Sequence, residues 1–294
     1  MDRETHDVFD REVAADTDYA LGYIAAYEQF LGYFGLPTSG TTILELGPGR
    51  NFGPQLVMAE RGARMILADL YLTGFGRPYH PAIYKSLNAR LPNRSLLLET
   101  AENGYADVPL RLLHEPAEAL RSVENGSVDF VYSNATLEHV FDVARTAQET
   151  ARVMRDGGCA AHQVDLRYHF HDFQRPLDHL IVSDDEFLAE ATASKWVCGN
   201  RVRSLEFVGH FESVGLRVVE RETNLRCDKD YFVDAVRRLR ASGSSYRLWP
   251  VDDLLRISAR FYLKKETGRA AEDTMERGRD LLQTLATLKA AAHA

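Results

Sequence analysis

Residues 43–53 read ILELGPGRNFG, and they carry the clearest indication of the fold. Its first residues belong to an apolar run at 41–46, which predicts a buried strand. Residues 55–61, after the first glycines, have the pattern of a helix. Glycine accepts positive φ and lets a ligand approach the backbone, and the first N–H groups of a helix attract a carboxylate or phosphate. The stretch therefore predicts a strand, a turn and a helix that bind a small ligand.

The residues around this turn discriminate between ligands. Asp69 closes a second expected strand at 64–69, 20 residues after Gly49, where a carboxylate can accept hydrogen bonds from ribose hydroxyls. Phe52 stands where a dinucleotide fingerprint has its third glycine, which weakens pyrophosphate binding. Glu45 would repel a pyrophosphate but can accept a hydrogen bond from an ammonium group. A ligand with both an ammonium and a carboxylate group fits this pairing.

The chain around the turn alternates between strand and helix patterns. Further strands are expected at 109–113, 127–133, 159–165, 216–220 and 258–264, and helices at 19–34, 82–90, 144–155, 204–214 and 271–292. The first of these helices is expected to begin after a capping run, Asp16-Thr17-Asp18. The alternation predicts an α/β fold of the Rossmann-like, doubly wound type, with a mostly parallel sheet and helices on both faces.

The 294 residues exceed what such a sheet needs. We expect an N-terminal helical cap at 1–40, one domain at 41–264 with insertions at 70–107, 166–203 and 224–257, and a C-terminal helix at 265–294. Substrate choice is expected to reside in the insertions. The C-terminal helix is expected to pack on the domain or to form the contact of a homodimer.

The composition excludes several classes of partner. With 35 Lys and Arg against 43 Asp and Glu the net charge is −8, which works against binding a nucleic acid. The start, MDRETH, lacks the features of a signal peptide, and no segment approaches the roughly 18 apolar residues of a membrane span. Cys159, Cys198 and Cys227 fit neither a disulfide framework nor a zinc spacing. We therefore expect a cytoplasmic protein with reduced thiols.

Four motifs follow one another at regular intervals. They are ILELGPG at 43–49, the acidic end of the second strand at Asp69, VDFVYSNATLEHV at 128–140 and ARVMRDGG at 151–158. In this order they resemble class I S-adenosylmethionine-dependent methyltransferases, strongly over 41–165 and more weakly to 264. The resemblance implies a methyltransferase with S-adenosyl-L-methionine as its cofactor.

The resemblance also implies which residues bind the cofactor. They are Glu45, Gly47, Pro48, Gly49, Asp69, Leu70, Glu115, Pro116, Ala117, Ser133 and Asn134. The glycine turn would hold the methionine part above Glu45, while Asp69 would hold the ribose and Leu70 would pack on the adenine. Proline stands at 116 where the family often has an acidic residue, so Glu115 would take that role. Ser133 and Asn134 would border the sulfonium end.

A second group of polar residues follows the strand at 159–165. It contains His162, His169, His171 and His179 together with Asp165, Arg167 and Asp172. Ligands of open α/β sheets bind at the carboxyl ends of the strands, and histidine serves well as a general base for a hydroxyl. The candidate proton acceptors are His139, His162, Asp165 and His169. Arg167 would anchor an anionic or polyhydroxy substrate, with Tyr23 and Tyr27 as secondary substrate contacts.

Structural interpretations stay open beside these. The histidines can be surface or supporting residues, and the aromatic stripe that contains Tyr23 and Tyr27 can be core packing. The pattern His169-x-His171-Asp172 could bind a metal ion, but nothing supplies the remaining ligands, so no metal is predicted.

The sequence thus predicts methyl transfer to a hydroxyl or amine of a small molecule, such as a sugar or a secondary metabolite. Residues 133–136 read SNAT, not the N-P-P-Y/F signature that goes with methylation of nucleic acid bases. Two alternatives remain. One is a nucleotide-cofactor oxidoreductase on the same fold, which Phe52 disfavours, and the other is a non-catalytic protein that binds S-adenosylmethionine.

Overall fold

The chain forms two compact units in a computed structural model that describes residues 3–91, 94–169, 173–195, 197 and 199–293. Contacts between Cα atoms divide it into Met1–Glu115, here the N-terminal unit, and Pro116–Ala294, the C-terminal unit. The domain boundaries expected from the sequence stay predictions.

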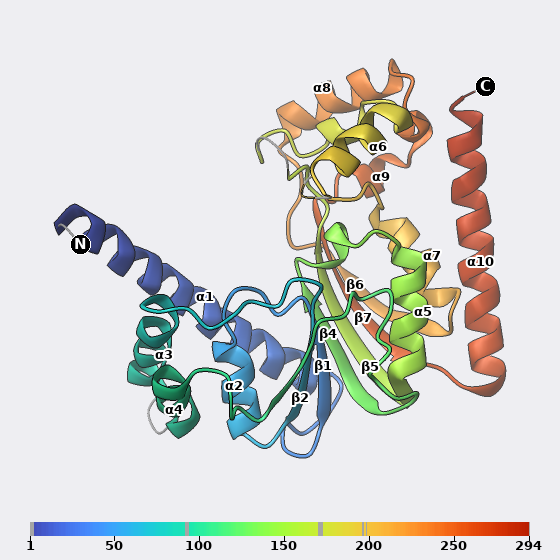
Figure 1. Ribbon diagram of the computed structural model, residues 1–294. Helices are drawn as coiled ribbons and strands as arrows, with labels where there is room; N and C mark the ends of the chain where they lie inside the picture. Colours follow the sequence, from blue (N-terminus) through green and yellow to red (C-terminus); the bar gives the residue numbers. More distant parts are fainter. Residues whose placement is uncertain (1–2, 92–93, 170–172, 196, 198, 294) are drawn as a thin grey trace. The chain divides into compact units, whose positions relative to one another are not determined.

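The N-terminal unit contains three parallel strands in the order β3-β2-β1, and Figure 1 labels β1 and β2. Its elements are α1 (Arg3–Tyr33), β1 (Thr42–Leu46), α2 (Gly53–Glu60), β2 (Arg64–Ala68), α3 (Tyr79–Arg90), α4 (Ser95–Asn103) and β3 (Leu110–Leu113). Four of the five residues in β1 and in β2 are buried. Strands covered on both faces read as continuous apolar runs, which is why the sequence located them. The predicted strand, turn and helix are present, because β1 leads through the glycines into α2.

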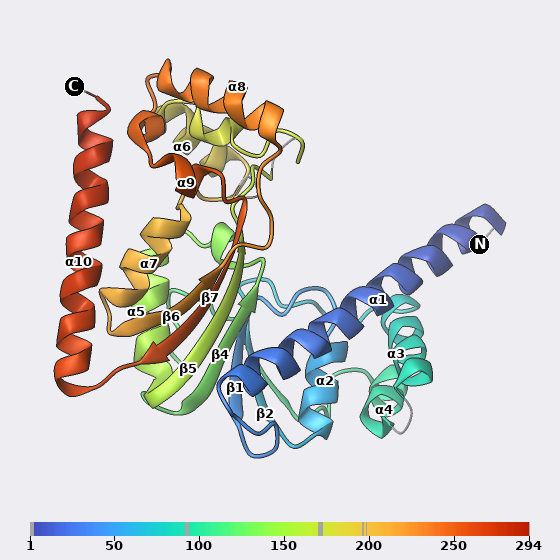
Figure 2. The same ribbon diagram turned by 180° about the vertical axis from the view of Figure 1, so that it is seen from behind.

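Helix α1 is much longer than the sequence predicted (Figure 2). The expected cap at 16–18 is wrong, because the helix runs through these residues. Inside the helix the Thr17 hydroxyl donates to the Val13 carbonyl at 2.7 Å, a bond that satisfies a polar side chain without ending the helix. The apolar stripe is buried as expected, with Tyr27 and Phe30 fully covered. It packs against α2 and α3.

The C-terminal unit contains four strands in the order β4-β5-β7-β6. They are β4 (Val128–Asn134), β5 (Met154–Asp165), β6 (Leu216–Glu222) and β7 (Ser258–Lys265). β4 and β5 are parallel, whereas β7 runs antiparallel to both of its neighbours. β5 begins at Met154, before the predicted start at Cys159, and the register of β4 and β5 shifts between Val128 and Phe130. With helices between most strands, the predicted α/β, Rossmann-like fold class is confirmed.

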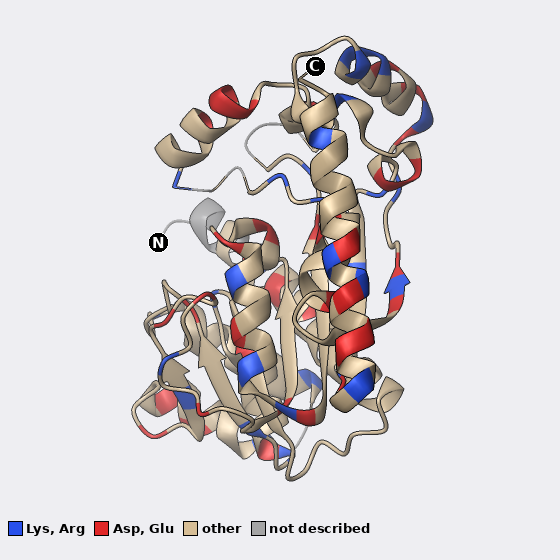
Figure 3. Ribbon diagram, turned by 90° about the vertical axis from the view of Figure 1, so that its right-hand side faces the viewer, with Lys and Arg blue, Asp and Glu red and all other residues tan. Residues whose placement is uncertain are grey.

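Three helices of this unit, α5, α7 and α10, run side by side (Figure 1). The helices are α5 (Val143–Val153), α6 (Asp184–Ala193), α7 (Ser204–Glu212), α8 (Lys229–Arg240), α9 (Val251–Leu254) and α10 (Gly268–Ala291), with the 3-10 turns η1 (Leu137–His139), η2 (Asp178–Leu180) and η3 (Ser245–Leu248). A Cβ at Gly278 of α10 would lie 2.2 Å from the Ser213 nitrogen, so this contact needs glycine. Figure 3 shows Lys, Arg, Asp and Glu residues distributed along α10.

The two insertions expected at 166–203 and 224–257 share one hydrophobic core. Its buried members include Leu177 and Leu180 from the first and Leu239, Trp249 and Leu254 from the second. Segments far apart in the sequence therefore form one helical layer in this unit. Among the described residues, no helix combines the length and the apolar character that crossing a bilayer requires.

Candidate functional site

The glycine turn of the N-terminal unit opens directly after β1. Gly47 and Gly49 adopt φ values of 67° and 77°, which side chains rarely tolerate. The Gly47 N–H donates to the Ala68 carbonyl at 2.9 Å and so ties the turn to the end of β2. A Cβ added at Gly49 would meet no atom within 4 Å. The turn is thus bare of side chains on a face that a ligand could fill, and Pro48 is buried beside it.

Glu45 lies below this turn with a fully buried carboxylate. It accepts hydrogen bonds from the hydroxyl of Tyr23 at 2.6 Å, from the hydroxyl of Tyr27 and from the amide nitrogen of Gln55 at 2.7 Å. Burial raises the pKa of Glu45 to about 7, against the effect of these three donors. The two tyrosines therefore fix Glu45 in place. Their role as substrate contacts stays a prediction, and the complete burial of Tyr27 disfavours it.

Asp69 and Leu70 lie at the end of β2, beside the turn. The Asp69 carboxylate accepts the Tyr71 N–H at 2.7 Å through Oδ1, which orients it without burying it. Leu70 is 42% exposed, an apolar side chain in contact with water. A carboxylate and an apolar surface in succession suit a ribose and a purine ring.

The insertion at 70–107 supplies a wall of aromatic residues that the sequence analysis did not assign. The His80 ring bonds the Arg50 carbonyl at 3.0 Å through Nε2 and stacks on Phe75. The Tyr84 hydroxyl accepts the Phe52 N–H at 3.3 Å. These contacts hold residues 50–52, which follow the glycines. In the sequence, only the length of the insertion indicated that this segment contributes to the site.

In the C-terminal unit, two predicted residues face each other on neighbouring strands. The Ser133 hydroxyl of β4 lies 2.8 Å from Nδ1 of His162 on β5, and neither side chain is exposed. His162 stacks on Phe211, and burial lowers its pKa to about 3, so it is neutral. This placement weighs against direct substrate contact by His162. Asn134, at the end of β4, is half-buried.

Three other predicted positions lie at the junction of the units along the chain. Glu115 and Pro116 are half-buried and Ala117 is buried. The Pro116 carbonyl accepts the Ala119 N–H at 2.9 Å, which makes a turn after β3. The roles implied for them at the adenine stay predictions.

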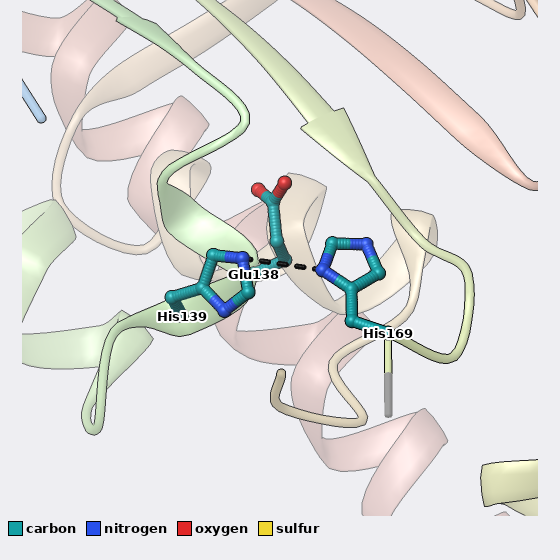
Figure 4. Close-up of side chains that lie close together, drawn as sticks. All are labelled: Glu138, His139 and His169. Carbon is teal, nitrogen blue, oxygen red and sulfur yellow. Dashed lines mark hydrogen bonds between the residues drawn. The ribbon is translucent and has the colours of Figure 1, made fainter. Parts of the chain in front are cut away.

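A histidine pair lies beyond the carboxyl ends of β4 and β5 (Figure 4). Nε2 of His139 and Nδ1 of His169 are 3.2 Å apart, and both side chains are half-buried. Glu138 joins them with a side chain that is almost fully buried. Burial raises the pKa of Glu138 to about 8, against the backbone N–H groups of Glu138 and Asp165, which lower it, and with some repulsion from the Asp165 carboxylate. Glu138 is not among the residues predicted from the sequence, because a glutamate in a polar loop carries no signal of burial.

Asp165 and Arg167 are predicted site residues that the structure pairs with each other. Arg167 donates to both carboxylate oxygens, through Nε at 2.9 and 3.1 Å and through Nη2 at 2.5 Å. Asp165 Oδ2 also lies 3.5 Å from His169 Nε2. Although burial opposes it, hydrogen bonding to His169 and Arg167 lowers the pKa of Asp165. Asp165 is therefore a fixed anion suited to orienting His169, and a weak proton acceptor.

Asn200 holds the turn that carries the cluster, although it lies 61 residues beyond His139. Its side-chain amide donates to the carbonyls of Leu137 at 2.8 Å and Val140 at 3.2 Å. Its own N–H donates to the Glu138 carbonyl at 2.5 Å. Asn200 thus fixes the backbone of η1, although the two segments are far apart in the sequence.

The remaining histidines of the expected cluster do not join it. His179 is buried and stacks on Tyr168. His171 and Asp172 lie outside the described residues, so the pattern with His169 considered for a metal ion is not described. The structure thus keeps His139, Asp165, Arg167 and His169 together, while His162 and His179 are buried against other rings.

Comparison with known families gives one match. Residues 88–161 match a family model described as a methyltransferase domain. No curated protein matches the sequence.

Several solved structures are similar at low identity. One is phosphoethanolamine N-methyltransferase 2 of Haemonchus contortus, solved with S-adenosyl-L-methionine, at 15% identity and a TM-score of 0.47 over 81% of this chain and 52% of that one. A second is a geranyl diphosphate C-methyltransferase of Streptomyces coelicolor A3(2), at 15% identity and a TM-score of 0.45 over 82% of this chain and 75% of that one. A third is an S-adenosylmethionine-dependent methyltransferase of Mesorhizobium loti, at 17% identity and a TM-score of 0.44 over 78% of this chain and 92% of that one. The chain spans about half the length of the first of these.

The family match lies on the part of the chain that carries β3, β4, α5 and most of β5. It includes two of the four motifs of the resemblance, at 128–140 and 151–158, and does not reach the motif at 43–49 or Asp69. The match supports the predicted methyltransferase over this part of the chain, which resembles a methyltransferase domain.

Proposed function

We propose that this methyltransferase acts on a hydroxyl or amine of a small molecule. The observation that carries the proposal is the half-buried pair His139 and His169, with Asp165 beside His169. A neutral hydroxyl or an ammonium must lose a proton when it accepts a methyl group, and an imidazole is suited to take it near neutral pH.

The residues of the glycine turn fit the methionine part of the cofactor. Gly49 leaves open the space that a Cβ would take, and Glu45 lies below the turn as an acceptor held by three donors. Asp69 and Leu70 would hold the ribose and the adenine. In the C-terminal unit, Pro116, Ala117 and Asn134 keep their implied roles, while the Ser133 hydroxyl is already bonded to His162. When bound, S-adenosylmethionine supplies a methyl group on a sulfonium, a good leaving group.

The acceptor side is assigned to the C-terminal unit. His169 would take the proton, with Asp165 holding its ring and Arg167 holding Asp165. His139 contacts His169 and would share the proton. Because Arg167 is engaged in a bidentate ion pair, its predicted role as the anchor of an anionic substrate would require that pair to open.

A calorimetric titration tests the cofactor residues. We expect S-adenosylmethionine and S-adenosylhomocysteine to bind and NAD not to bind. Asp69→Ala should weaken cofactor binding at least tenfold, about 1.4 kcal/mol, because the ribose loses its acceptor. Asp107→Ala, an exposed carboxylate of the same unit, is the matched control, and His162→Ala should also spare binding. Unchanged affinity in Asp69→Ala would remove the ribose assignment, and binding of NAD alone would favour the oxidoreductase.

Turnover on a panel of small hydroxyl and amine compounds tests the acceptor class. Release of S-adenosylhomocysteine should depend on the compound added, and His169→Ala should lower kcat far more than it changes KM. Cofactor binding without turnover on any compound class would favour a non-catalytic binding protein. A cytoplasmic location, a homodimer and the absence of a nucleic acid partner stay predictions.

A further inference from the structure

The cluster at the end of β4 contains a buried carboxylate with unmet bonding capacity. Glu138 is 3% exposed, and both of its oxygens are buried without a hydrogen-bond partner among the described residues. A carboxylate in such a position is costly, because it has lost its water and no side-chain donor among the described residues replaces it. Natural structures resolve this cost with a proton, a hidden water or a cation.

Two imidazoles lie where they could share a cation with Glu138. One ligand atom from each of Glu138, His139 and His169 falls within 4.8 Å of the others. The two facing nitrogens, Nε2 of His139 and Nδ1 of His169, are 3.2 Å apart. Two nitrogens at about 2.0–2.1 Å from one tetrahedral zinc ion lie about 3.3–3.4 Å apart, so the histidine spacing already matches that geometry. In Figure 4 the Glu138 carboxylate lies to one side of the line that joins the two facing nitrogens.

The surroundings of His169 match those of a metal ligand. Asp165 Oδ2 lies 3.5 Å from its outer nitrogen, Nε2, and Asp165 is itself fixed by Arg167. A carboxylate at that nitrogen favours the tautomer with the proton on Nε2, and so leaves the lone pair of Nδ1 facing His139 and Glu138. Carboxylates placed in this way behind histidine ligands are common at zinc sites.

We propose that Glu138, His139 and His169 form a binding site for a divalent transition metal ion, with zinc as the best fit. Two imidazole nitrogens and one carboxylate oxygen suit zinc and leave one position of a tetrahedron for water or a substrate atom. Both histidines are partly exposed, which gives an ion a way in, and Asn200 holds the backbone of η1 in place. The metal and a proton compete for the same lone pairs, so the base role proposed for His169 belongs to the metal-free form. The site itself does not depend on the proposed function.

A titration of the full chain with Co²⁺ tests the site, after the protein has been treated with a chelator and desalted. We expect one equivalent to bind with the visible absorption of a tetrahedral site, and Zn²⁺ to displace it. Glu138→Gln and His169→Gln should each weaken binding at least tenfold. His114→Gln, an exposed histidine of the N-terminal unit, should not change it.

The proposal is overturned if the wild type takes up no Co²⁺ in this form, or if Glu138→Gln binds it as tightly as His114→Gln does. Glu138→Gln keeps the side-chain volume and removes no hydrogen bond, so it answers the question even if His169→Gln misfolds. Binding of S-adenosylmethionine to the same preparation is a separate measurement. Its failure would count against the proposed function and leave the metal site standing.

Discussion

Glu45 and Glu138 are both buried glutamates near the carboxyl end of a strand, and they differ in their partners. Glu45, in β1, receives three hydrogen bonds from Tyr23, Tyr27 and Gln55. Glu138, in η1 after β4, receives none from a side chain among the described residues. Burial raises the pKa of both. Burial alone therefore does not mark a functional carboxylate. The hydrogen bonds of Glu45 are made within the N-terminal unit, whereas the oxygens of Glu138 can still bind a ligand from outside the chain.

The largest expected effect is on stability at Glu45. Glu45→Leu leaves three buried donors without an acceptor, and we expect it to lower the free energy of unfolding by about 3–5 kcal/mol. Denaturant unfolding measures this loss. Tyr23→Phe in the Glu45→Leu background should recover part of it, because one orphaned donor is removed. A loss below about 1 kcal/mol would mean that the hydrogen bonds to Glu45 contribute little.

A smaller effect is expected on the pH dependence of stability. The pKa of Glu45 is raised from 4.5 to about 7, so the folded protein keeps a proton that the unfolded chain releases. The contribution of Glu45 to the free energy of unfolding is therefore fully present below pH 4.5, and it is lost as the pH rises toward 7. Between these values, stability should fall by up to about 1.4 kcal/mol per pH unit more steeply in the wild type than in Glu45→Gln. Parallel profiles from unfolding at several pH values would contradict the raised pKa.

The smallest effect, and the one of opposite sign, is expected at Glu138. Glu138→Leu removes a buried carboxylate and breaks no side-chain hydrogen bond. In the absence of metal we therefore expect the free energy of unfolding to equal that of the wild type or to exceed it by about 1 kcal/mol. Denaturant unfolding in the presence of a chelator measures it. Destabilisation as large as that of Glu45→Leu would erase the contrast between the two carboxylates.

The sequence predicted those features that depend on local pattern. Continuous apolar runs located β1 and β2, and the glycines between β1 and α2 identified the turn, because these signals lie within a few residues. Thr17 misled the prediction of the first helix, since a residue that suits a cap can also bond back within a helix. The burial of His162 was in principle readable, because it shares its face of β5 with Ala160 and Val164, which are also buried.

Features that depend on distant contacts could not be predicted. Asn200 reaches the turn at Leu137 from 63 residues away. Nothing local marks Glu138 as buried, and nothing in the length of the insertion at 70–107 shows that His80 and Tyr84 hold the residues after the glycines. These contacts arise from tertiary packing, which single-sequence patterns do not encode.

Calorimetric titration of two matched glycine variants tests the claim that the glycine turn binds S-adenosylmethionine. Gly49 and Gly40 have φ values of 77° and 82°, and an added Cβ meets nothing within 4 Å at either position. Gly49→Ala and Gly40→Ala should therefore cost similar backbone strain, but only the first places a methyl group in the turn. We predict cofactor affinity at least tenfold weaker in Gly49→Ala and unchanged in Gly40→Ala. Equal affinities in the two variants would contradict the claim.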